Sequence, residues 1–127
     1  MIKRAKYLNA IQAFINKPVI KVITGIRRCG KSTLLQQIVA ELIDRGIKQE
    51  QIIFINKELF EFDNVKTYKD LNYYISSKIK NSKSNHYIFV DEIQEIEDWE
   101  KSIGSLFAEN KHDIYITGSN ANLLSSE

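Results

Sequence analysis

The amino-acid sequence predicts a three-layer α/β fold, in which helices cover both faces of a parallel β-sheet. Short apolar segments alternate along the chain with stretches whose apolar residues recur every three or four positions, an order typical of β-α-β units. Such connections are right-handed and place the strands parallel to one another. A length of 127 residues and a hydrophobic fraction of 43% indicate one domain, or part of a larger one, with a sizeable core.

Four segments have the composition of buried strands. They are short and rich in Val, Ile, Phe and Tyr, and glycine or polar residues follow them. Because their apolar residues run on without strict alternation, we expect the sheet to be buried on both faces. The predicted strands cover residues 19–24, 52–55, 87–90 and 114–117.

Helical patterns precede and separate these strands, and their ends carry capping signals. Gly46 is expected to end the helix after the first strand as a C-cap. The next helix begins at Thr67 with Asp70 three residues later, a capping-box pattern, and the last follows Asp98 as an N-cap. The predicted helices lie within residues 1–17, 34–43, 67–79 and 99–107.

The residues after the first strand form a phosphate-binding motif. Gly25-Ile26-Arg27-Arg28-Cys29-Gly30-Lys31-Ser32 matches G-x-x-x-x-G-K-[ST] and lies between a predicted strand and a predicted helix, as the motif requires. Glycines let backbone N–H groups converge on phosphate, the helix start adds its positive dipole end, and the lysine neutralises the β- and γ-phosphates. The expected nucleotide-binding residues are Gly25, Arg28, Cys29, Gly30, Lys31, Ser32 and Thr33.

Two acidic residues follow the third strand. Asp91 stands where a nucleotide site needs a carboxylate near Mg²⁺, usually through bound water. The adjacent Glu92 is the candidate for orienting or deprotonating an attacking water, which favours hydrolysis over phosphoryl transfer to another substrate. The expected metal ligands are therefore the Ser32 hydroxyl and Asp91.

Polar residues also follow the second and fourth strands. If the fourth strand lies between the first and the third, Ser119 is the first candidate to sense the γ-phosphate, with Thr117 and Asn120 as alternates. An ordinary turn explains the same residues equally well. Asn56 could hydrogen-bond Glu92 and hold it away from water, although a turn role is favoured for an asparagine at a strand end.

Three segments together resemble a known family. VIKVITGIRRCGKSTLLQQI, IFVDEIQEIEDWE and IYITGSNANLLSSE are similar to prokaryotic ATPases of the AAA+ superfamily whose loop reads G-x-R-R-x-G-K-[ST]. The resemblance covers nearly all of the chain and implies a P-loop NTPase fold with a sensor strand inserted between the first and third strands. It also implies ATP and Mg²⁺ as ligands, with Glu92, Lys31 and Ser119 as catalytic residues.

The same resemblance implies that the 127 residues are the N-terminal part of a longer ATPase core. A fifth strand, a helical lid and an arginine finger would follow residue 127, and the finger could also come from a neighbouring subunit. A C-terminal domain or a homo-oligomer is therefore an expected partner. Because an arginine finger is worth roughly 10³–10⁵ in rate, we expect this chain to bind ATP and to hydrolyse it slowly.

Charge and composition bear on nucleic-acid binding, membrane spanning and cellular compartment. A net charge of +2, from 18 basic and 16 acidic residues, does not indicate a nucleic-acid partner. No apolar run approaches the ~20 residues of a membrane span, and a single cysteine without a signal sequence favours the cytoplasm. Two alternatives stay open: a nucleotide-dependent switch with little turnover, and a nucleic-acid-binding module. The basic residues of that module would be Lys3, Arg4, Lys6, Arg27 and Arg28.

Overall fold

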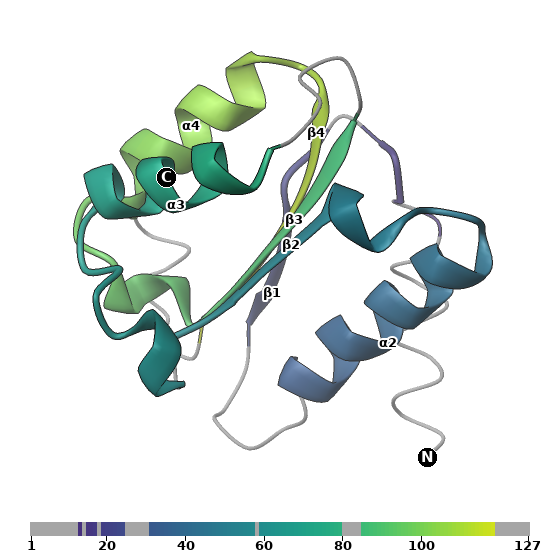
Figure 1. Cartoon of the computed structure of the whole chain (residues 1–127), viewed down its shortest axis with the longest axis horizontal. Helices are drawn as coiled ribbons and strands as arrows, with labels where there is room; N and C mark the ends of the chain where they lie inside the picture. Colours follow the sequence, from purple (N-terminus) through teal and green to yellow (C-terminus); the bar gives the residue numbers. More distant parts are fainter. Residues whose placement is uncertain are drawn as a thin grey trace.

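A computed structural model describes residues 13, 15–17, 19–24, 31–57, 59–79 and 85–118, with residues 31 and 32 described by their backbone alone. Its centre is a four-stranded sheet in which every neighbouring pair of strands is parallel (Figure 1). The α/β fold class is therefore confirmed, and so is the expectation that the fourth strand lies between the first and the third. The spatial order is β1 (Lys21–Thr24), β4 (His112–Gly118), β3 (His86–Asp91) and β2 (Ile52–Asn56).

Helices cover both faces of this sheet and make the three expected layers. One face carries α2 (Lys31–Asp44), whereas α3 (Tyr68–Lys78) and α4 (Trp99–Ala108) lie side by side on the other (Figure 1). Within the described part of the chain, no helix is both long enough and apolar enough to cross a membrane. The connections include three single-turn 3-10 helices, η1 (Gln49–Gln51), η2 (Phe60–Phe62) and η3 (Ile93–Glu95).

Alternation along the strands divides the core into two clusters. In β3, Ile88 and Val90 pack with residues of α3 and α4, whereas Tyr87 and Phe89 pack with residues of α2. None of these four side chains is more than 3% exposed. Because residues two apart in a strand share a face, covering both faces requires apolar side chains at successive positions, as the sequence pattern indicated.

Aromatic rings on the α2 side form a ladder across three strands. Phe54, Phe89 and Tyr115 are register partners, and their stacked rings have centroid distances of 5.7 and 4.6 Å. The ladder continues to β1, where the Nζ of Lys21 lies 5.1 Å from the centroid of its register partner Tyr115. Cross-strand pairs of this kind favour one register over a slipped one.

Two of the capping predictions are confirmed. Gly46 has a φ of 97°, and its N–H bonds to the Ile43 carbonyl at 3.0 Å, so a left-handed glycine ends α2. At the start of α3, the Asp70 N–H donates to the Thr67 hydroxyl at 3.3 Å, and the Thr67 N–H donates to the Asp70 carboxylate at 3.1 Å. This reciprocal pair is a capping box.

The prediction that the side chain of Asp98 caps α4 is wrong. Asp98 has a left-handed backbone, with a φ of 57° and a ψ of 33°, and its side chain makes no capping hydrogen bond. A side-chain N-cap normally needs an extended backbone. Backbone hydrogen bonds from Tyr68 to Glu97 (2.9 Å) and from Glu97 to Lys66 (2.8 Å) tie the preceding residue to the start of α3. These long-range contacts set the path of the chain at residue 98.

The first predicted helix lies largely outside the described residues. Of residues 1–17, only 13 and 15–17 are described, and these adopt turns and a bend. The Val19 N–H donates to the Lys17 carbonyl at 2.8 Å, which is a tight turn. Residue 19 is therefore part of a turn, and β1 begins at Lys21.

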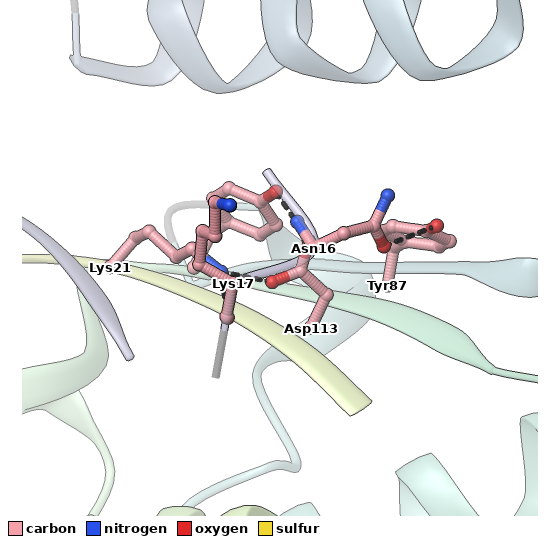
Figure 2. A network of polar contacts seen from close by, with 6 residues as sticks. Asn16, Lys17, Lys21, Tyr87 and Asp113 are labelled. Carbon is pink, nitrogen blue, oxygen red and sulfur yellow. Dashed lines mark hydrogen bonds and ion pairs between the residues drawn. The ribbon is translucent and has the colours of Figure 1, made fainter. Parts of the chain in front are cut away.

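A buried polar cluster ties this turn to the amino edge of the sheet (Figure 2). The Lys21 ammonium forms an ion pair with the Asp113 carboxylate and donates to the Lys17 carbonyl at 2.8 Å. The second carboxylate oxygen of Asp113 accepts the Asn16 N–H at 2.9 Å and the Tyr115 hydroxyl at 2.6 Å. Burial and the contact with Asp113 raise the pKa of Tyr115, so its hydroxyl stays protonated and donates. Both buried charges are thereby paired.

Candidate functional site

The carboxyl ends of the parallel strands meet at one edge of the sheet, and polar residues are buried there. Asp91 is the last residue of β3, Glu92 follows it, and Thr117 is the next-to-last residue of β4. Asp91 and Thr117 are 0% exposed, and Glu92 is 3% exposed. Carboxylates so far removed from water need hydrogen bonds or positive charge around them. The structure thus buries both acidic candidates at this edge, whereas metal binding by Asp91 stays a prediction.

One hydroxyl group joins the two acidic residues. Thr117 Oγ1 donates to Asp91 Oδ1 and accepts the backbone N–H of Glu92 at 2.9 Å. The sheet register pairs Val90 with Ile116, which brings the ends of β3 and β4 together. Thr117, one of the alternate sensor candidates, thus contacts both candidate site acids, whereas sensing of a γ-phosphate stays a prediction.

The backbone at Glu92 has an unusual, left-handed conformation. Its φ of 60° and ψ of 53° lie in the left-handed region, which costs free energy for any residue with a β-carbon. The following turn is closed by a hydrogen bond from the Glu95 N–H to the Glu92 carbonyl at 3.1 Å. Ile93 and Ile96, which are 0% and 1% exposed, anchor that turn in the core beneath α3 and α4. Packing of these isoleucines therefore stabilises the strained residue.

Sequence reasoning missed Gln94, which contacts one of the site acids. Its Nε2 donates to Glu92 Oε1 at 2.6 Å. A glutamine two residues after a glutamate belongs to no motif, and residues two apart do not share a face of a helix. They share a face only in a strand, and β3 ends at Asp91, before both of them. Only the left-handed residue and the 3-10 turn bring them together, and the apolar spacing of Ile93 and Ile96 is a weak sign of such a turn.

The phosphate-binding loop itself lies mostly outside the described residues. Gly25, Arg28, Cys29 and Gly30 are not described, and neither are Ser119 and Asn120. The frame around the loop is clear, because β1 ends at Thr24 and α2 begins at Lys31. The loop therefore joins the carboxyl edge of the sheet to the amino end of a 14-residue helix, where free N–H groups and the helix dipole attract anions. Thr33 lies in the first turn of that helix and is half-buried.

Asn56 lies at the same edge, opposite Asp91 in the register. Its carbonyl accepts the Leu59 N–H at 3.0 Å, as the turn interpretation expects. The Lys57 N–H reaches the Asp91 carbonyl at 3.3 Å, so this turn is attached to the acidic strand. Next to it opens a cavity of about 290 Å³. The cavity is lined by Gln36, Phe54, Asn56, Leu59, Glu61 and Phe62.

Comparison with known proteins places the fold and the motifs in one family. Residues 17–127 match the protein family described as "AAA domain". An uncharacterized protein of Haemophilus influenzae is 44% identical over 127 residues, covering 100% of this chain and 32% of that protein. An uncharacterized protein of Methanocaldococcus jannaschii is 38% identical over 130 residues, covering 98% of this chain and 27% of that protein. The chain thus spans at most about a third of these relatives.

A solved structure has the same fold. The crystal structure of Cdc6p from Pyrobaculum aerophilum superposes with a TM-score of 0.66 at 12% sequence identity, covering 96% of this chain and 40% of that chain. At this identity the likeness shows the fold alone. The family match extends over most of the chain and implies nucleotide binding. The chain belongs to the AAA domain family, a family of AAA+ P-loop ATPases.

Proposed function

We propose that the protein binds Mg²⁺-ATP at the carboxyl edge of its sheet and hydrolyses it to drive or switch a conformational change. Family membership and the glycine loop between β1 and α2 support nucleotide binding. The observation that carries the proposal is the hydroxyl of Thr117, which bonds Asp91 and the backbone of Glu92 at once. It holds Asp91, the expected metal ligand, and the backbone of Glu92, the expected general base, in fixed relative positions. Catalysis by orientation of the reacting groups requires such fixed positions.

The residues at this edge fit a magnesium ion. Asp91 provides hard carboxylate oxygens at a fully buried position, and Mg²⁺ prefers such oxygens together with hydroxyl groups and water. Ser32 and Asp91 would hold the ion, and Lys31 with the loop amides would bind the phosphates. When bound, Mg²⁺ would neutralise charge on the phosphate oxygens.

Hydrolysis would use the protein's own groups as follows. The oxygen of a water molecule attacks the γ-phosphorus while the bond to the bridging β–γ oxygen breaks, and Glu92 takes the proton that the water loses. Ser119 would contact the γ-phosphate as a sensor. The products are ADP and inorganic phosphate. Because turnover also needs a cation such as an arginine finger, supplied by a C-terminal region or a second subunit, slow hydrolysis by this chain belongs to the proposal.

Calorimetric titration with Mg²⁺-ATP tests the binding step. We expect Lys31→Ala to weaken binding at least tenfold, because it removes the lysine that the motif uses to neutralise phosphate oxygens. Lys69→Ala is the matched control, since Lys69 is an exposed lysine on α3, across the sheet from α2. Equal affinities in the wild type and both variants would show that the glycine loop is not the phosphate site.

A further inference from the structure

We propose that Gln94 is a positioning residue for Glu92, which holds the glutamate carboxylate in one orientation toward the attacking water. The inference rests on the proposed function, and it assigns a role to a side chain outside the phosphate-binding and acidic motifs. Its starting point is the short contact of 2.6 Å between Gln94 Nε2 and Glu92 Oε1.

The direction of this hydrogen bond follows from charge. A glutamine amide can be turned so that its oxygen and nitrogen exchange places. With Gln94 turned, two oxygen acceptors would face each other at the separation of 2.6 Å, and they would repel. An amide N–H donating to a carboxylate is instead a charge-assisted hydrogen bond, which is short and strong. Gln94 therefore uses its donor end on Glu92.

The other end of the amide supports this assignment. Gln94 Oε1 is buried and has no hydrogen-bond partner among the described residues. A buried acceptor without a partner costs free energy, and the side chain would avoid that cost by rotating toward a donor or toward solvent. Among the described residues, the contact with Glu92 is thus the hydrogen bond that holds this amide in place.

The backbone makes the contact rigid. Glu92 is fixed at its N–H by Thr117 and at its carbonyl by Glu95. Gln94 lies within η3, whose flanking residues Ile93 and Ile96 are buried in the core. Both ends of the hydrogen bond thus start from anchored backbone, so the bond removes rotamer freedom from the glutamate side chain. A general base held in this way is already oriented when the substrate binds.

The consequence is specific to the chemical step. Gln94 would act through Glu92 and not on the phosphates, so its loss should lower the hydrolysis rate while leaving nucleotide affinity unchanged. Misplacing a general base costs roughly 10- to 100-fold in rate. Gln94→Met keeps the length of the side chain and removes the donor, and Gln94→Glu keeps the shape and replaces the donor with a second carboxylate.

Two measurements on this chain test the proposal. In NMR spectra, the side-chain amide protons of Gln94 should be well separated and protected from exchange, and Glu92→Ala should abolish both properties. In single-turnover hydrolysis of Mg²⁺-ATP, Gln94→Met should lower the rate about tenfold in the wild-type background and have no effect in the Glu92→Gln background. Glu95→Ala, which changes an exposed side chain of the same turn, should change neither.

The outcomes separate this proposal from the proposed function. Failure of the wild type to bind Mg²⁺-ATP would reject the function, and the NMR measurement would still decide the contact. Equal rate losses from Gln94→Met in both backgrounds would mean that Gln94 acts on general structure. A faster rate would mean that it restrains Glu92. Equal rate losses or a faster rate would each overturn the positioning role. So would Gln94 amide signals that Glu92→Ala leaves unchanged. If Gln94→Met fails to fold, Gln94→Glu replaces it in the same cycle.

Discussion

Thr117→Val tests whether one hydroxyl organises the acidic edge of the sheet. Valine keeps the branching and nearly the volume of threonine, but it can neither accept the N–H of Glu92 nor donate to Asp91. The N–H of Glu92 would lose its partner at a residue that is 3% exposed, and a buried donor left unsatisfied costs ~1–3 kcal/mol. The hydrogen bond from Thr117 to the Asp91 carboxylate is lost as well, and a bond to a charged group is worth ~1.5–3 kcal/mol. Because such losses overlap, we expect a destabilisation of about 2–4 kcal/mol.

Urea unfolding followed by tryptophan fluorescence measures this cost. The chain has one tryptophan, Trp99, which packs against the core cluster beneath α3 and α4 and reports on its integrity. With a denaturant slope of ~2 kcal/mol/M, the midpoint should fall by about 1–2 M. Thr117→Ser is the control, since it keeps the hydroxyl and loses a methyl group worth ~1 kcal/mol. A valine variant as stable as the serine variant would refute the bridging role.

Two further predictions use the same unfolding assay. Asp113→Ala should destabilise the protein by about 3–5 kcal/mol, because it leaves the buried Lys21 ammonium unpaired. The double variant Lys21→Met/Asp113→Leu should recover the part of that loss that comes from the unpaired charge, but not the part from the lost acceptor of the Asn16 N–H and the Tyr115 hydroxyl. Equal losses in both proteins would contradict the unpaired-charge argument. Backbone hydrogen bonds from Lys66 and Thr67 lower the pKa of Asp70 below its ordinary value of 3.8. The contribution of Asp70 to stability is therefore fully present above pH 3.8, and it disappears as the pH falls through the lower pKa of the folded state. Wild type and Asp70→Ala should therefore differ at pH 7 and converge in strong acid, and a difference independent of pH would show that the carboxylate charge plays no part.

Local patterns predicted the elements because their causes are local. A glycine at the end of a helix and a Thr67-x-x-Asp70 capping box depend on residues a few positions apart, and both were confirmed. The capping role of Asp98 was wrong, because hydrogen bonds between Glu97 and the start of α3 decide the backbone there. The strand order was also predicted correctly, but from family resemblance, since nothing in a strand's own residues says which strand it will neighbour.

The sequence by itself determined the kind of fold, the phosphate-binding motif and the identity of the acidic pair, because periodicity and motif spacing are properties of short segments. The tertiary structure alone decided how that pair is held. Thr117 and Asp91 are 26 residues apart in the chain, and Lys21 and Asp113 are 92 apart, so these contacts exist only once the strands are in register. Gln94 reaches Glu92 because buried isoleucines hold a left-handed turn. Packing of the core stabilises a left-handed backbone conformation that Glu92 would not favour in an isolated segment.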